Sequence, residues 1–180
     1  MSEVWLRPNR RVLLMAMVPT VLLGAVGLGL LEIAESATSR TVAWLLTTVA
    51  AMLLVGLLHQ VLRPRIGYRD GLVLFYLKAG GPIEVPVHVV EAFFLGQGPA
   101  ELPTRLPSQA ETVNLIARLS QRESSWASKE VKQALGNWQN GYATIRGTWC
   151  EPLSSDLIRQ LNRRLGEASR AVKATEGAAS

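Results

Sequence analysis

The chain has 180 residues, of which 48% are hydrophobic and only 18% are charged. Soluble domains average about 25% charged residues, and the deficit here comes mainly from the first third of the chain. The net charge is +5, but we find no basic run and no alternation of basic and aromatic residues. The composition therefore gives no support for a nucleic-acid partner, and an arrangement that faces anionic lipid explains the charge at least as well.

Two long uncharged segments predict membrane-spanning helices at about residues 12–31 and 41–62. A helix needs roughly 20 apolar residues to cross about 30 Å of hydrocarbon. We therefore divide the chain into a transmembrane hairpin (1–62), a cytoplasmic domain (63–173) and a disordered tail (174–180). The alternative is a signal peptide cleaved near Ala34-Glu35-Ser36, although the first apolar run exceeds the usual length of about 7–15 residues.

The charges beside the spans predict an integral protein of the cytoplasmic (inner) membrane with both termini in the cytoplasm. Arginines precede the first span and follow the second, whereas the connecting loop has two glutamates and one arginine. Tryptophan is also favoured at membrane interfaces, although Trp44 has packing between the helices as an alternative role. The predicted interface residues are Trp5, Arg10, Arg11, Trp44, Arg63 and Arg65.

Small residues in the first span predict a close helix–helix contact at Gly24, Ala25 and Gly29. Such residues let a second helix backbone approach closely. Packing within the hairpin is one interpretation, and formation of a homo-oligomer through the transmembrane helices is the other.

The chain after the spans predicts antiparallel strands followed by one helix. Asp70-Gly71 and Asn140-Gly141 are strong signals of tight hairpins. Pro86 predicts an edge strand or a bend, and we expect a loop at about residues 96–111. From Ser154 or Ser155 onward, apolar residues recur every three or four positions, which is typical of an amphipathic helix.

This order of elements resembles the pleckstrin-homology (PH) architecture, a two-sheet antiparallel sandwich capped by a C-terminal helix. The resemblance covers about residues 64–171 and includes the opening hairpin Arg65-Ile66-Gly67-Tyr68-Arg69-Asp70-Gly71 and the helix after Cys150. Together with the two preceding spans, it is similar to the membrane-anchored bacterial PH-like proteins of uncharacterised function. PH domains that bind phosphoinositides carry several basic residues across the first hairpin, whereas the turn here is acidic.

The sequence predicts no enzyme, metal site or cofactor. His59 and His88 are far apart, and Glu84 and Glu91 flank His88 without an accompanying nucleophile. The single cysteine, Cys150, is expected to be buried and inert.

We therefore expect a docking or scaffold module that presents the domain to a protein partner or to membrane lipid. The candidate surface comprises Arg69, Lys78, Phe93 and Phe94, because a regular strand must expose one of two adjacent phenylalanines. The alternative function is a structural subunit of a larger membrane complex that assembles through its helices. The sequence does not identify the partner.

Overall fold

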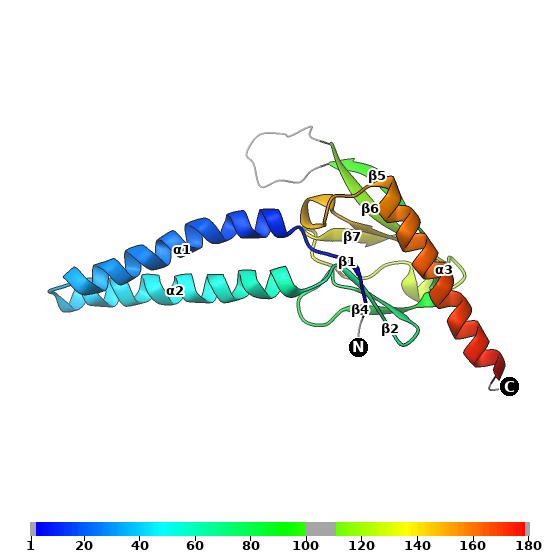
Figure 1. Ribbon diagram of the computed structural model, residues 1–180, viewed down its shortest axis with the longest axis horizontal. Coiled ribbons are helices and arrows are strands. Elements are labelled where there is room, and N and C mark those ends of the chain that lie inside the picture. Colours follow the sequence, from blue (N-terminus) through cyan, green and yellow to red (C-terminus); the bar gives the residue numbers. More distant parts are fainter. Residues whose placement is uncertain (1–2, 100–110, 179–180) are drawn as a thin grey trace. The chain divides into compact units, whose positions relative to one another are not determined.

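The computed structural model describes residues 3–99 and 111–178, which form two compact units (Figure 1). One unit comprises residues 8–63 and contains the two long apolar helices. The other joins residues 1–7 to residues 64–180. The helical unit thus ends one residue after the predicted boundary at residue 62, and the first seven residues group with the domain.

The N-terminal residues belong to the second unit because they form a strand of its first sheet. Strand β1 (Glu3–Leu6) pairs antiparallel with β2 (Ile66–Arg69), so that Leu6 lies opposite Ile66. Trp5 is 4% exposed and stacks on Tyr68, with ring centroids 5.2 Å apart. The predicted membrane-interface role of Trp5 is thus wrong, because its indole is buried in the core of the domain.

The hairpin unit consists of α1 (Arg10–Ile33) and α2 (Ala37–Leu62). The side chains of Asn9 and Ser36 cap the two helices by accepting backbone N–H bonds from the first turn. Each helix has a window of 18 residues with a mean hydropathy of 2.2, and each is long and apolar enough to cross a membrane. Only 17% and 11% of those windows are buried, so most of the apolar surface of both helices is uncovered.

The two helices pack through small residues. Thr20 and Gly27, seven residues apart, are buried on α1, and Ala43 and Ala50 are buried on α2 with the same spacing. A Cβ atom added at Gly27 would lie 3.0 Å from the backbone nitrogen of Thr47, so a larger residue would push the helices apart.

The predicted packing residues therefore divide between two faces of α1. A Cβ atom at Gly24 would lie 3.5 Å from the Cβ of Ala50, which places Gly24 against α2. Ala25 is exposed, and nothing lies within 4 Å of a Cβ atom added at Gly29. Ala25 and Gly29 do not contribute to the contact within the hairpin, and Gly27 makes the closest approach instead.

The first sheet has four strands in the order β1-β2-β3-β4, with β3 at Leu72–Phe75 and β4 at Ile83–Pro86. Asp70 and Gly71 join β2 to β3 with φ angles of 49° and 81°, as the predicted tight hairpin requires. The expectation for Pro86 is also correct, because β4 is an edge strand and a short 3₁₀ helix, η1 (Val87–Val89), follows it.

The second sheet has the order β5-β6-β8-β7. Its strands are β5 (Val90–Pro99), β6 (Glu111–Leu119), β7 (Gly136–Gln139) and β8 (Tyr142–Ile145). Asn140 and Gly141, with φ angles of 54° and 77°, form the second predicted hairpin turn. The predicted loop at 96–111 is partly wrong, because β5 and β6 pair as far as Pro99 and Glu111; residues 100–110 lie outside the described residues. The chain between β6 and β7 contains the short helix η2 (Ser124–Trp126).

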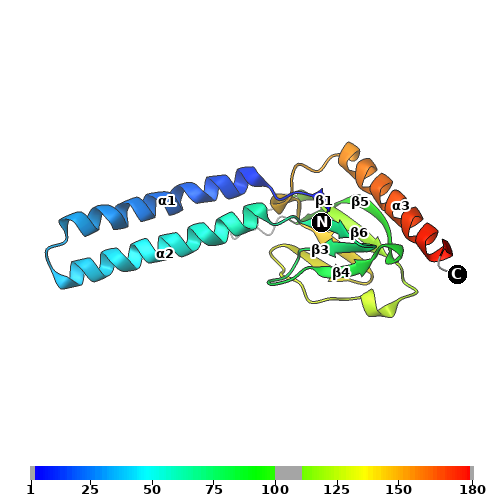
Figure 2. The same ribbon diagram turned by 60° about the horizontal axis from the view of Figure 1, so that its bottom comes forward.

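The last helix, α3 (Ser155–Ala178), lies beside β5 (Figures 1 and 2). Ser154 Oγ accepts the backbone N–H of Leu157, and the buried residues Leu161, Leu165 and Ala168 form the predicted apolar stripe. The helix continues to Ala178, so the predicted disorder is wrong for residues 174–178.

Asn162 on α3 forms a second connection between this helix and the edge of the second sheet. Its Oδ1 accepts the backbone N–H of Phe93 at 2.7 Å, and its Nδ2 donates to the carbonyl oxygen of Phe93 at 2.8 Å. The side-chain amide thus bonds to the β5 backbone as a neighbouring strand would. The β-sandwich and its C-terminal helix agree with the coarse fold class predicted from the sequence.

Candidate functional site

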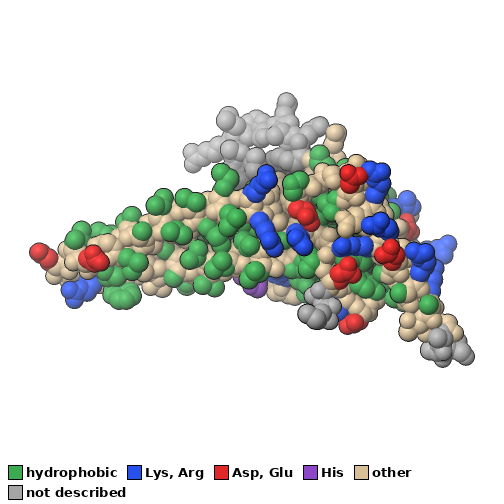
Figure 3. Space-filling model, in the orientation of Figure 1, with side chains coloured by type: hydrophobic (Ala, Val, Ile, Leu, Met, Phe, Trp, Pro, Cys, Tyr) green, Lys and Arg blue, Asp and Glu red, His purple; other side chains and the backbone are tan. Residues whose placement is uncertain are grey.

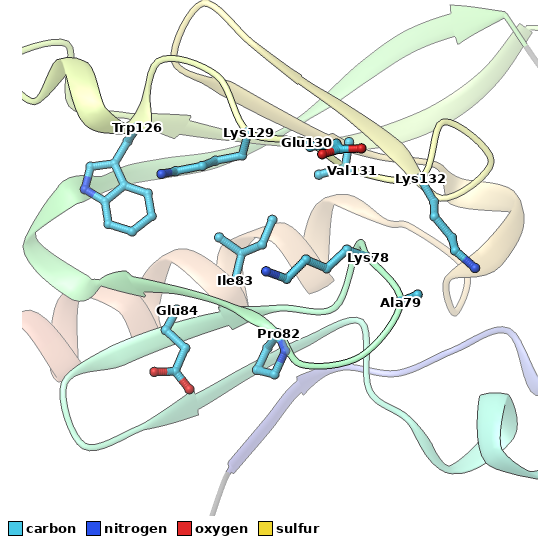
Figure 4. A pocket seen from close by; sticks show the side chains of 10 residues that line it. All are labelled: Lys78, Ala79, Pro82, Ile83, Glu84, Trp126, Lys129, Glu130, Val131 and Lys132. Atoms are coloured by element: carbon cyan, nitrogen blue, oxygen red, sulfur yellow. The ribbon is translucent and has the colours of Figure 1, made fainter.

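The domain has a pocket of about 590 Å³ beside β4 (Figure 4). One wall consists of β4 and the turn that precedes it, and the other wall is the segment 126–132. The volume lies within the range of roughly 300–1,000 Å³ that is typical of ligand sites. The residues that line the pocket are Lys78, Ala79, Pro82, Ile83, Glu84, Trp126, Lys129, Glu130, Val131 and Lys132.

Hydrogen bonds hold the second wall in place at both of its ends. At one end, the carbonyl oxygen of Trp126 accepts the indole N–H of the buried Trp138 at 2.9 Å. The indole N–H of Trp126 itself donates to Glu123 at 3.1 Å. At the other end, the backbone N–H of Lys132 donates to the carbonyl oxygen of Leu77 at 2.9 Å. The pocket is therefore built into the fold although segment 126–132 is mostly irregular.

Lysines dominate the charge of this pocket. Figure 4 shows the side chain of Lys129 reaching toward Trp126, whereas the side chain of Lys78 extends toward Ile83 from the opposite wall. The ammonium group of Lys129 lies 4.8 Å from the centroid of the Trp126 ring, within the range of a cation–π contact. The pocket thus combines mobile positive charge with an aromatic and aliphatic floor.

The acidic lining residues do not neutralise these lysines. Glu84 forms an ion pair with Arg69 at 3.0 Å, and its side chain points away from the pocket centre in Figure 4. Among the described residues, Lys78, Lys132 and Glu130 form no ion pair. An anionic group that enters the pocket would meet unpaired ammonium groups.

The structure does not gather the predicted surface residues into one site. Lys78 lines the pocket, and Arg69 touches it only through its ion pair with Glu84. Phe93 is 2% exposed and belongs to the core, so its predicted contact role is wrong. Phe94 is half-buried, with its ring edge-to-face against Tyr142 at 6.4 Å. The expectation that one of the two adjacent phenylalanines is exposed is met only in part, because Phe94 is half-buried.

Arg65 also departs from its predicted place at the membrane interface. Its side chain is 2% exposed within the domain, and its Nε donates to the carbonyl oxygen of Trp149 at 3.1 Å. Arg10, Arg11 and Trp44 are exposed on the hairpin unit, and Arg63 is the C-cap of α2. Their roles at a membrane interface stay predictions.

The residues considered for acid–base chemistry are dispersed over exposed ion pairs. His88 Nε2 lies 3.3 Å from Glu123, whereas Glu91 pairs with Arg118 at 2.8 Å. Burial raises the pKa of the Cys150 thiol to about 12, although the nearby Arg65 opposes that shift. This thiol is therefore buried, as the sequence predicted, and its raised pKa keeps it protonated at neutral pH. Across residues 3–99 and 111–178, no group of three His, Cys, Asp or Glu side chains is placed to hold a metal ion.

Sequence reasoning missed the pocket because its second wall has no periodic pattern. Lys129 and Lys132 follow Trp126 at intervals of three residues, but a charge on an irregular segment usually indicates only a solvated surface. Comparison with known proteins adds no assignment, since no protein-family model, curated protein or solved structure matches this chain.

Proposed function

We propose that the protein is a membrane-anchored, non-enzymatic docking module whose PH-like domain lies at the cytoplasmic leaflet and binds a protein partner. The observation that carries this proposal is the pairing of β1 with β2. Leu6 and Ile66 lie opposite each other in these two strands, and residues 7–65 separate them in sequence. The apolar hairpin is therefore an insertion between two paired strands. A domain that is joined to two apolar helices at neighbouring strand ends would be held at a membrane by two short connections.

The uncovered apolar surface of the helices supports membrane insertion. In a soluble protein, the burial of large aliphatic side chains is a principal source of stability, and large apolar patches are rarely left exposed. Here Met15, Ile33 and Leu62 are each more than 70% exposed within the described structure. Lipid is the solvent that removes this cost, since apolar helices satisfy their own backbone hydrogen bonds.

The first strand argues against the signal-peptide alternative. Cleavage near residues 34–36 would remove β1 and with it Trp5 and Leu6, which are 4% and 0% exposed in the domain core. The pairing of β1 with β2 also favours a hairpin whose two ends lie on one side of the bilayer. Arg10, Arg11 and Arg63 at these ends favour the cytoplasmic side.

The two antiparallel sheets and the C-terminal helix support the PH-like interpretation. The domain has one strand, β1, that the sequence did not predict, and β8 rather than β7 lies next to β6. Since one fold supports many activities, the docking role depends on the pocket and the anchor rather than on the fold.

The proposal is tested by site-specific photo-crosslinking of the full-length protein in cells. A photo-reactive amino acid replaces Ala79, which lines the pocket, and the matched control replaces Ala171, which is exposed on α3. We expect a membrane-fraction adduct with another protein at position 79 and none at position 171. Equal labelling at both positions, or no adduct at either, would contradict a docking site at the pocket.

A second candidate function, that of a structural subunit of a larger membrane complex, is favoured by the position of Ala25 and Gly29. Both face away from α2, so these small residues are available to another helix. We expect the double variant Ala25→Leu/Gly29→Leu to lose any higher-order assembly seen by native mass spectrometry while the domain stays folded. An unchanged mass distribution would exclude assembly through this face.

A further inference from the structure

The walls of the pocket beside β4 differ in what their backbones offer to a ligand. Val87 N–H donates to the carbonyl oxygen of Gly71 at 2.8 Å, so the N–H at position 87 points toward β3. Backbone N–H groups alternate in direction along an antiparallel strand. The positions whose backbone nitrogen faces away from β3 are therefore 86, 84 and 82. Positions 86 and 82 are prolines and have no N–H. A partner strand would find one outward N–H on β4, that of Glu84, which disfavours extension of the sheet.

The opposite wall has free backbone groups. Between the tied residues Ala127 and Lys132, the backbone of 128–131 makes no hydrogen bond within the part of the chain that the structure describes. Lys129, Glu130 and Val131 of this stretch line the pocket, so three consecutive residues there have peptide groups that the fold does not use. An extended peptide can use such groups, whereas a simple inorganic anion uses few of them.

The side chains of the pocket select for negative charge beside an apolar group. Lys78 and Lys129 supply two ammonium groups, while Ile83 and Val131 supply aliphatic surface between the two walls. Glu130 adds one carboxylate that can accept an N–H donor. A peptide offers all three complements at once: carboxylate side chains, apolar side chains and backbone N–H groups.

On this basis we propose that the pocket binds a short acidic segment of a partner protein, with its carboxylates between Lys78 and Lys129. The proposal rests on the docking function and specifies the chemistry of the partner. Tethering at a membrane raises the effective concentration of both molecules, so that modest affinity is sufficient. The attraction between exposed charges is screened by salt over about 8–10 Å, and binding must therefore weaken as ionic strength rises.

The test measures fluorescence anisotropy with the full-length protein in nanodiscs of phosphatidylcholine. The probe is a fluorescein-labelled octapeptide of alternating glutamate and valine, and the reference peptide has glutamine in place of glutamate. We expect the acidic peptide to bind at least tenfold more tightly than the reference and to lose affinity between 50 and 300 mM salt. Equal binding of the two peptides would overturn the proposal.

Matched variants assign the binding to the pocket. Lys78→Gln/Lys129→Gln removes two charges from the pocket, and Arg163→Gln/Lys173→Gln removes two exposed charges from α3. We expect a loss of at least tenfold for the first pair and less than twofold for the second, with affinity retained in Lys78→Arg/Lys129→Arg. Equal losses for both glutamine pairs would mean that binding depends on net charge alone, and would overturn the assignment of the binding to the pocket.

Competition distinguishes a peptide from other anions. Millimolar inorganic phosphate, or nanodiscs that contain phosphatidylserine, should displace the peptide no more than an equal ionic strength of sodium chloride does. Specific displacement by either would identify a phosphate-bearing ligand and overturn the peptide proposal. If peptide binding fails while photo-adducts still form at position 79, the acidic occupant alone is wrong. If the adducts are also absent, the docking function fails with it.

Discussion

Replacement of Trp5 by alanine should strongly destabilise the domain, because this side chain lies in the core that β1 completes. A buried tryptophan contributes about 150–250 Å² of covered surface, and Trp-to-Ala changes in cores cost about 3–5 kcal/mol. Trp5 is 4% exposed, so the full range applies. Since folded domains are stable by only about 5–15 kcal/mol, the variant should lose a large part of its stability.

The measurement is pulse proteolysis of the full-length protein in nanodiscs at increasing urea concentration. With a slope of about 2 kcal/mol per molar urea, in the middle of the usual range, the midpoint of domain unfolding should fall by about 1.5–2.5 M. The urea midpoint of Trp5→Phe should lie between those of the wild type and Trp5→Ala, because phenylalanine retains an aromatic ring against Tyr68 but covers less surface. The Trp5 indole N–H has no hydrogen-bond partner within the described structure, so Trp5→Phe sacrifices no such bond.

The matched control is Trp44→Ala, since Trp44 is 58% exposed on α2 and lies in the other unit. It should leave the urea midpoint of the domain unchanged. If Trp5→Ala unfolded at the same urea concentration as Trp44→Ala and the wild type, Trp5 would be an interface anchor after all. The structural role of β1 would then be refuted.

Three further predictions concern single contacts. Asn162→Ala should lower the free energy of unfolding, measured in urea, by about 1–3 kcal/mol, because two buried backbone groups of β5 lose their hydrogen-bond partners. An unchanged urea midpoint would contradict the bonds described. The pKa of Cys150 is raised in the folded protein, so the unfolded chain loses the thiol proton at a lower pH than the folded one. Between pH 9.0 and 12, the free energy of unfolding should therefore fall by up to about 1.4 kcal/mol per pH unit relative to Cys150→Ala. Parallel pH profiles of the two proteins would disprove the burial of Cys150. Gly24→Cys/Ala50→Cys should oxidise to an intrachain disulfide, whereas Gly29→Cys/Ala50→Cys should not, as read from the gel mobility of each variant.

The features that sequence predicted well are those fixed by neighbouring residues. Asp70-Gly71 and Asn140-Gly141 adopt the positive φ angles that a two-residue hairpin needs, whatever the rest of the chain does. The apolar runs of α1 and α2 and the stripe of α3 are equally local patterns. These elements were predicted correctly because short-range chemistry determines them.

The first strand could not be predicted because its partner is distant in sequence. Glu3–Leu6 has only four residues, and it pairs with Ile66–Arg69 only after the chain has completed the whole hairpin. A tryptophan close to an apolar span is also what a membrane anchor looks like. Sequence context thus favoured the wrong role for Trp5, and the same holds for Arg65, whose neighbours suggested a flanking charge.

The pocket was hidden for a related reason. Lys78 lies about fifty residues before Lys129, and the bond between Lys132 N–H and the carbonyl oxygen of Leu77 links the two walls. A hydrogen bond between irregular segments has no signature in residue type. The surface view in Figure 3 shows basic and acidic side chains interspersed over the domain, whereas hydrophobic side chains cover most of the two long helices.

Under the proposed membrane anchorage, the protection of three strand edges bears on how densely this protein can populate a bilayer. Asn162 occupies the outer side of β5, Arg164 donates to the carbonyl oxygen of Val4 in β1, and Pro82 and Pro86 leave Glu84 as the one outward N–H at β4. Molecules confined to two dimensions collide often and in similar orientations, and exposed strand edges would then pair between neighbouring copies. Protection of these three edges would let many anchored copies share a small area without pairing through them.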